Sequence, residues 1–357
     1  GNAVVSDDAK VYGNAVVSDD AKVYGNAVVS GCAVVSGCAE VYGNAVVSGC
    51  AEVYGHAVVY GHAEVHGYAV VSDNAEVYGG ARVSDNARVS DDAEVHGYAV
   101  VSGNVVVYGN AEISGCARVF GTAVVSDDAV VSGNAEISGG ARVSGCARVF
   151  GTAEVSDDAE VSGNVVVSDN AEVYGGARVS DNARVSDDAE VHGYAVVSGN
   201  VVVYGNAEIS GCARVFGTAV VSDDAVVSGN AEISGGARVS GCARVFGTAE
   251  VSDDAVVSGN AEISGCARVS SINDYITFKN FWSSGRFFTW TRSNNKWKVG
   301  CFYGLGDELI SKAYEDSQKS GREYERVVKY VESILHDEPI KDEQKNEESS
   351  SVAAPKD

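Results

Sequence analysis

A strict period of six residues runs through most of this chain and limits what the chain can fold into. Every sixth residue from Val5 to Val269 is Val or Ile, which gives 45 positions without an insertion or deletion. The residue two positions earlier is Ala, except at Val105, Val165 and Val201, where it is Val. Such a period fits neither a helix of about 3.6 residues per turn nor a sheet of long strands. It predicts very short strands that alternate with corners.

The composition of each hexad predicts how one short strand and the corner after it, together one edge of a coil, would fold. Ala and the following Val or Ile are two residues apart, so both side chains lie on the same side of a strand. Gly, Asn and Asp then form the corner, because they tolerate positive φ angles. Three edges close a triangular coil of 18 residues, and stacked coils pair as parallel strands about 4.8 Å apart. Residues 1–270 therefore predict about 15 coils, a rod of roughly 70 Å.

The unit, for example residues 9–14 (AKVYGN), resembles the hexapeptide repeat of left-handed parallel β-helix proteins. That superfamily includes acyltransferases and γ-class carbonic anhydrases. The resemblance covers residues 1–270 and implies a left-handed coil, which the period alone does not reveal. It implies no activity, because the repeat describes a core and not a site. The expected fold class is mainly β: a single-stranded left-handed parallel β-helix of about 15 triangular coils, followed by a small α+β C-terminal domain.

The period stops after Val269, and residues 271–336 predict a small separate domain whose frequent aromatic residues form its core. Its segments GCFYG (300–304), DEL (307–309) and REY (322–324) resemble a C-terminal domain of uncharacterised hexapeptide-repeat proteins in bacteria and their phages. The histidine that this family usually has between its helices is absent around residues 317–320. We expect a β-β-β-α-α order, with strands near 275–278, 286–292 and 297–302 and helices over about 307–317 and 321–335.

The net charge of -24 is divided unevenly along the chain. Residues 1–270 carry 13 Lys and Arg against 35 Asp and Glu, whereas residues 271–336 carry 10 against 8. Residues 337–357 carry 3 against 7 and predict a disordered acidic tail. An acidic rod disfavours nucleic acid and anionic membranes as partners. The C-terminal domain is the better place to seek an acidic partner.

Residues 18 apart should stack on one face of the rod, and one such column is aromatic. Aromatic rings about 4.8 Å apart can stabilise one another, or they can offer a flat strip to a sugar or a protein partner. Mutual stabilisation is the favoured interpretation, and the ligand strip is the alternative. The candidate binding residues are Tyr24, Tyr42, Tyr60, Tyr78 and His96.

A second column is acidic and would repel itself unless cations or neighbouring Arg residues relieve it. Divalent cation binding is one interpretation, but each coil offers a single carboxylate there. We favour a solvated acidic face with raised pKa values over a metal site. The column consists of Glu136, Glu154, Glu172, Glu190 and Glu208.

Eight of the nine cysteines follow a corner glycine, and we expect them to be small corner residues. Cys32 and Cys50 should stack within the Cα separation of a disulfide. A zinc site built from these two with Cys38, His56 and His62 is not expected, because the residues fall on three corners about 15 Å apart. We expect no metal or cofactor. The scattered cysteines argue against a secreted disulfide scaffold, and a cytoplasmic location is favoured.

Three features argue against catalysis. Hexapeptide acyltransferases generally use a histidine base and loops that project from the coils, but no loop interrupts these hexads. Cys301 has no histidine placed near it by any motif and is expected to be structural. The spacings of the histidines also match no three-histidine zinc pattern. The six histidines are His56, His62, His66, His96, His192 and His336.

A long internal duplication also favours a structural role. Residues 70–159 and 166–255 are identical at an offset of 96, which is five coils plus one edge. The second copy is therefore turned onto another face of the rod, which a spacer would tolerate and a precise site would not.

We accordingly expect a non-enzymatic rigid acidic spacer that presents, or is capped by, its C-terminal domain. The alternatives are a hexapeptide-type acyltransferase and a carbohydrate or cell-surface binder. The expected partner is an unknown protein or glycan, with no nucleic acid and no membrane. A homotrimer and end-to-end association are both compatible with this architecture.

Overall fold

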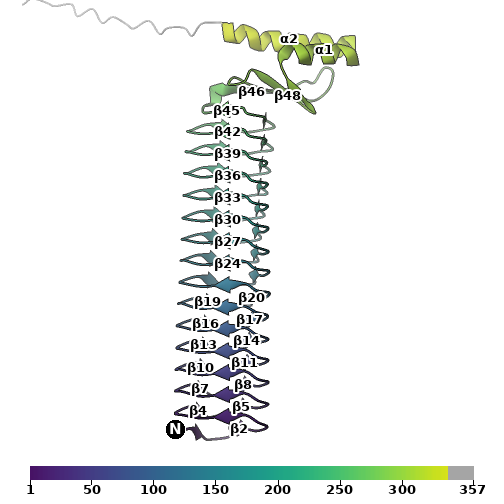
Figure 1. Ribbon diagram of the computed structural model, residues 1–357. Coiled ribbons are helices and arrows are strands. Elements are labelled where there is room, and N and C mark those ends of the chain that lie inside the picture. Colours follow the sequence, from purple (N-terminus) through teal and green to yellow (C-terminus); the bar gives the residue numbers. More distant parts are fainter. Residues whose placement is uncertain (337–357) are drawn as a thin grey trace, which may run out of the picture.

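A computed structural model describes residues 1–336 of the chain, and its first 269 residues form a straight rod (Figure 1). Each hexad contributes one strand of two residues. Strand β1 is Val4–Val5, each later strand begins six residues after the one before it, and β45 is Arg268–Val269. The strands form three sheets of 15, and each strand pairs with the strand three places further along. The predicted parallel β-solenoid of about 15 turns is confirmed, whereas the left-handed coil stays an expectation from the resemblance.

The core of the rod follows directly from the hexad. The Ala and Val or Ile positions are fully buried from Ala21 to Val269, whereas the residue between them points outward. Paired strands are in register with a separation of 18 residues, so that Val59 lies beside Val77 and Val58 beside Glu76. With the exceptions of Val105, Val165 and Val201, alanine therefore stacks on alanine and Val or Ile on Val or Ile from coil to coil.

The corner of each hexad has a left-handed backbone that Gly or Asp supplies. Gly103, Gly163 and Gly199 have φ angles of 90°, 84° and 90°. Each of them lies two residues before one of the Val residues that replace the buried Ala. These are the three widest φ angles of the rod, since the other corner glycines have φ between 62° and 81°.

Aspartate at a corner gains a hydrogen bond that glycine cannot make. The Asp85 backbone has a φ of 61°, which is costly for most residues but tolerated by Asp. Its carboxylate accepts a hydrogen bond of 3.1 Å from the backbone N–H of Gly103 in the next coil. Asp91 and Gly109 repeat the arrangement at 3.1 Å. A corner Asp thus links consecutive coils.

The C-terminal module, residues 270–336, has four strands rather than the three expected. The predicted strand over 297–302 is divided at Gly300, whose φ of 56° reverses the chain and pairs Val299 with Phe302. Both predicted helices are present, and their bounds differ by a few residues from those expected. The elements are η1 Ile272–Asp274, β46 Tyr275–Lys279, β47 Phe287–Thr291, β48 Lys296–Val299, β49 Phe302–Gly304, α1 Gly306–Asp316 and α2 Gln318–His336.

The antiparallel sheet β46–β49 lies between the end of the rod and the two helices (Figure 1). Phe288 and Trp290 on β47 are buried in the cluster that the sheet forms with the helices. Thr289, which lies between them, instead contacts the rod. The expectation that the aromatic residues form the core of the module is confirmed for Phe288, Trp290 and Trp297. It is wrong for Phe281 and Trp282, which are 74% and 66% exposed. The face toward the rod is polar because the last coil ends in free backbone groups.

Side chains of the module supply the hydrogen bonds that a further coil would otherwise make. In the rod, the backbone N–H of an outward strand residue donates to the next coil, as from Lys22 to Ala39 O at 2.9 Å. In the last coil, Glu262 N–H donates to Thr289 Oγ1 at 3.0 Å. Arg268 N–H donates to Ser293 Oγ at 2.7 Å. Hydroxyl groups of the module thus replace the missing ladder.

Two tyrosines complete this junction. Tyr275 Oη accepts from Ser258 N–H at 3.3 Å and donates to Val256 O at 3.0 Å. Tyr303 Oη donates to Ser264 O at 3.1 Å. Both phenols therefore satisfy groups on the terminal edge of the rod, and the module packs directly on the last coil.

The connection between the rod and β46 is stabilised by one carboxylate. Asp274 Oδ2 accepts from the backbone N–H groups of Ser270 and Ser271, both at 2.8 Å, and from Ser270 Oγ at 2.9 Å. Burial alone would raise the pKa of Asp274, but these hydrogen bonds lower it. The carboxylate therefore stays ionised and holds the turn.

Within residues 1–336, no helix is both long enough and apolar enough to cross a bilayer. The expected acidic tail, residues 337–357, lies outside the described residues.

The junction generates a test with a matched control. Gly265 and Gly259 are both in the last coil with φ of 65° and 67°, so alanine strains the backbone equally at each. A Cβ at Gly265 would lie 2.1 Å from Tyr303 Oη, whereas nothing lies within 4 Å of one at Gly259. We expect Gly265→Ala to displace the module and speed exchange of the Glu262 and Arg268 amides by at least about tenfold, the effect of losing roughly 1.4 kcal/mol.

Hydrogen exchange measured residue by residue decides the outcome. Gly259→Ala should leave the Glu262 and Arg268 amides protected as in the wild type. Equal protection of these amides in both variants would contradict the junction described above.

Candidate functional site

The aromatic column forms a continuous stack of rings on one edge of the rod. The ring centroids of Tyr24, Tyr42, Tyr60, Tyr78 and His96 are separated in turn by 4.9, 5.0, 4.8 and 4.7 Å. Neighbouring rings are tilted by no more than 8° from parallel. The structure therefore brings all five candidate residues together at the spacing expected from the coil rise.

Carboxylates on the next coil hold the hydroxyl ends of the rings. Tyr24 Oη donates to Glu40 at 3.1 Å, and Tyr78 Oη donates to Glu94 at 2.9 Å. Burial and the Glu40 carboxylate raise the pKa of the Tyr24 phenol to about 12. Burial and Glu94 likewise raise the pKa of Tyr78. The phenols are thus kept protonated as hydrogen-bond donors.

The stack leaves little of the ring faces for a ligand. A sugar packs on an aromatic ring through the face of that ring, where the π-electrons are exposed. Both faces of Tyr42, Tyr60 and Tyr78 are covered by neighbouring rings. Their role as binding residues stays a prediction, and the geometry favours mutual stabilisation.

The duplicated block keeps only part of this arrangement. Tyr174 and His192 are the copies of Tyr78 and His96, and their rings stack at 4.7 Å. Burial and Glu190 raise the pKa of Tyr174 to about 12. The residue 18 positions before Tyr174 is Ser156, so the stack ends there. The aromatic strip is therefore neither repeated in full nor continued on the same face.

Replacing one central ring tests its contribution to stability. Tyr60→Ala removes two stacking contacts and should lower the free energy of unfolding by about 2 kcal/mol, since each aromatic pair contributes roughly 0.5–1.5 kcal/mol beyond its burial. The matched control is Tyr54→Ala, because Tyr54 is 40% exposed and has no stacked ring within the described part of the chain. We expect a change below about 0.5 kcal/mol there. Equal losses in urea unfolding would show that the stack contributes nothing.

The acidic column also has the predicted geometry. Glu136, Glu154, Glu172, Glu190 and Glu208 are consecutive partners along one sheet. The ends of the column are relieved by hydrogen bonds or ion pairs, from Arg118 to Glu136 at 3.3 Å, from Tyr174 to Glu190 at 3.0 Å and between His192 and Glu208 at 3.2 Å.

The middle of the column is the least relieved part. Glu172 lies between Glu154 and Glu190, and it makes no hydrogen bond or ion pair through its side chain within residues 1–336. Burial first, and then the two neighbouring carboxylates, raise the pKa of Glu172. The expectation of a raised pKa is thus confirmed at this position. Because the folded state disfavours the ionised form, stability should increase as the pH falls through that pKa.

The raised pKa of Glu172 predicts how its replacement changes stability at two pH values. Glu172→Gln should raise the free energy of unfolding at pH 7 by about 0.5 kcal/mol, the ordinary effect of one cross-strand pair, and should matter less at pH 4. The matched control is Glu160→Gln, because Glu160 pairs with Arg142 and Arg178 at 3.3 Å. That variant should be less stable than the wild type at pH 7. A stabilised Glu160→Gln or a destabilised Glu172→Gln in thermal melts would disprove the repulsion.

The cysteines and histidines form no cluster of three or more possible metal ligands within residues 1–336. All nine cysteines are free thiols, including Cys32 and Cys50 on stacked coils. Burial, followed by the proximity of Cys32, raises the pKa of the Cys50 thiol. The two residues are therefore neighbours without a disulfide.

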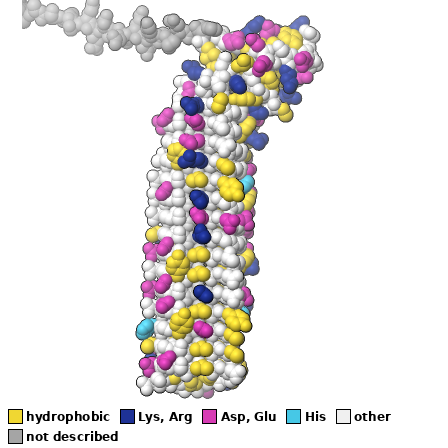
Figure 2. Space-filling model, viewed as in Figure 1, with side chains coloured by type: hydrophobic (Ala, Val, Ile, Leu, Met, Phe, Trp, Pro, Cys, Tyr) yellow, Lys and Arg dark blue, Asp and Glu magenta, His cyan; other side chains and the backbone are white. Residues whose placement is uncertain are grey.

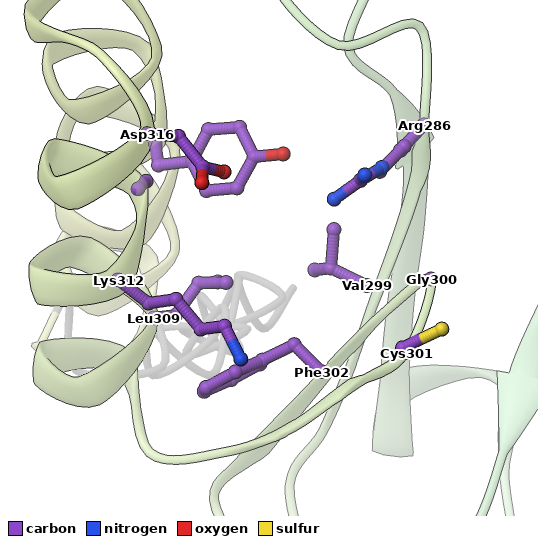
Figure 3. Close-up of a pocket in the computed structure, with 10 residues that line it drawn as sticks. Arg286, Val299, Gly300, Cys301, Phe302, Leu309, Lys312 and Asp316 are labelled. Atoms are coloured by element: carbon purple, nitrogen blue, oxygen red, sulfur yellow. The ribbon is translucent and has the colours of Figure 1, made fainter.

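One cavity lined by both charged and apolar side chains lies in the C-terminal module, and sequence analysis did not identify it. It has a volume of about 320 Å³ and lies between the β48–β49 hairpin and the helices (Figure 3). Arg286, Lys312 and Asp316 surround it together with Tyr324. Cys301 lies at its edge, but its sulfur points away from the space (Figure 3). Its walls are completed by Val299, Gly300, Phe302, Leu309 and Ala313.

A partial signal for this cavity was present in the sequence. Lys312 and Asp316 are four residues apart in the predicted first helix, and so lie on one face of it. Arg286 is far away in sequence, at the start of a strand. Only the packing of the sheet against the helices brings it to the same space.

Comparison with known proteins agrees with the architecture. A family model described as "YdcK Beta solenoid repeat" matches residues 81–97 and 177–193. These segments have the same sequence and lie 96 residues apart, one in each copy of the duplicated block. No curated protein matches the chain. With three parallel sheets wound from one continuous strand-and-corner unit, the chain is a β-solenoid repeat protein.

Proposed function

We propose that this solenoid is a non-enzymatic, rigid and acidic spacer that carries the C-terminal module at its end. The single observation that supports this most strongly is the unbroken ladder from β1 to β45, which ends on side chains of the module. A continuous ladder holds the module at a defined distance from the far end of the rod. We further propose that the chain is related to hexapeptide-repeat proteins and to the bacterial and phage proteins whose C-terminal domain it resembles.

The surface of the rod supports a spacer better than an enzyme. Its outward side chains form columns with no projecting loop, and Lys and Arg lie both along the rod and on the module (Figure 2). An acyltransferase needs a base in a shielded site. His96 and His192 instead each pair with one glutamate on the outer surface, at 3.1 and 3.2 Å. These histidines act within surface ladders.

The module also protects the end of the rod. A solenoid end exposes a row of unpaired strand groups, which favours association of one end with another. Lys298 adds an ion pair at this end of the rod: its Nζ lies 3.6 Å from a carboxylate oxygen of Glu262, and its side chain is only 15% exposed. The same Nζ lies 5.5 Å from the centre of the Phe246 ring. Its ion pair with the last coil adds to the hydroxyl contacts. The proposed role of the module is therefore that of a cap as well as a head.

Shortening the rod by whole coils tests the spacer. Deletion of residues 70–159 joins Ala69 to Glu160 and removes five coils without breaking the hexad. We expect a folded protein whose maximum dimension in X-ray scattering falls by about 24 Å, five coils at roughly 4.8 Å each. The Glu262 and Arg268 amides should keep their wild-type protection, because the junction is untouched. An unfolded product, or an unchanged length, would contradict a modular spacer.

The acyltransferase alternative and the carbohydrate-binding alternative each predict a different experimental result. Turnover of an acyl-coenzyme A that is lost on mutation of His66, His96 and His192 would overturn a non-enzymatic role. Glycan binding that is lost in Tyr42→Ala and kept in Tyr54→Ala would support the carbohydrate-binding alternative.

A further inference from the structure

The cavity of the C-terminal module has the composition of a binding site for a small zwitterion. From its lining residues we infer that it binds a ligand of amino-acid size that carries one carboxylate, one ammonium group and an apolar side group. This inference goes beyond the proposed spacer and does not depend on it. It rests on the charges around the cavity, on the unpaired hydroxyl of a largely buried tyrosine and on the apolar walls.

Three solvent-exposed charged side chains border the cavity without a partner in the protein. Arg286, Lys312 and Asp316 form no ion pair and no side-chain hydrogen bond with any of residues 1–336. Arg286 reaches from the sheet into the space, and Asp316 faces it from α1 (Figure 3). Lys312 extends from the same helix toward Phe302 (Figure 3). Two cations on a small cavity favour one carboxylate, and the single anion opposite favours a ligand that also bears a positive charge.

The hydroxyl of Tyr324 is the second feature. The side chain lines the cavity and is only 5% exposed, and its hydroxyl has no hydrogen-bond partner within the described chain. The ring itself is fixed by an edge contact with Phe288 at 4.7 Å between centroids. Because the hydroxyl makes no bond within the protein, it is available to donate to a ligand carboxylate in the cavity.

The walls and the size limit the ligand. Val299 and Phe302 from the hairpin and Leu309 from α1 supply apolar surface. A volume of about 320 Å³ is at the lower end of the range for ligand pockets. Phosphate is disfavoured, because Asp316 would repel a dianion and the apolar walls would remain empty.

Calorimetric titration of the full chain with four probes tests the site. The probes are L-leucine, 4-methylpentanoate without the ammonium group, 3-methylbutylamine without the carboxylate, and inorganic phosphate. We expect saturable binding of L-leucine, weaker binding of the two truncated probes and none of phosphate. No saturable binding of L-leucine, or binding of phosphate alone, would overturn the inference.

Substitutions of three lining residues test which group of the ligand each residue contacts. Arg286→Gln should weaken L-leucine binding by at least about tenfold, as expected on losing a hydrogen bond to a charged group. Tyr324→Phe should weaken it about fivefold while keeping the contact with Phe288. Asp316→Asn should weaken L-leucine binding but not that of 4-methylpentanoate.

Arg292→Gln is the control, because Arg292 belongs to the same module but does not line the cavity. Its affinity for L-leucine should equal that of the wild type. Equal affinity in Arg286→Gln and Tyr324→Phe, with unchanged unfolding midpoints, would disprove the assignment.

Discussion

The structure depends on backbone hydrogen bonds that pass from each coil to the next. Every strand of the rod, from β1 to β45, has two residues, so none of them could persist by itself, and stability comes from stacking many similar edges. The buried Ala and Val or Ile positions keep neighbouring coils in register, since small side chains stack mostly on small ones and large side chains on large ones one coil away. The corner residues serve the same ladder, because a left-handed Gly or Asp turns the chain without interrupting it.

A ladder of this kind has an end, and the last coil shows how that end is satisfied. The module presents hydroxyls from Thr289, Ser293, Tyr275 and Tyr303 where a further coil would have presented backbone groups. Its sheet is therefore divided in function, with aromatic side chains toward the helices and polar ones toward the rod. The same sheet, packed against α1, also creates the charged cavity around Arg286 and Asp316.

Much of this architecture can be predicted from the sequence, because the rod is local in character. The hexad determines strand, corner and register within 18 residues, and the spacing of Tyr24 through His96 follows from that register. The fold of the C-terminal module cannot be predicted from a local pattern in the same way. The strand expected over 297–302 is two strands because a glycine turn at Gly300 interrupts it, and a short aromatic run with one glycine is ambiguous. Arg286 and Tyr324 meet only through tertiary packing, which no local pattern encodes.

Because the coil is regular, the number of hexads in the rod also determines the direction in which the module points. Three edges make one coil, so adding three hexads lengthens the rod and leaves the direction of the module unchanged. Adding one hexad turns the module by a third of a revolution about the axis of the rod. The two duplicated segments are offset by 96 residues, which is sixteen hexads and therefore not a whole number of coils. An insertion of that size would change both how far the module stands from the far end and which way it faces.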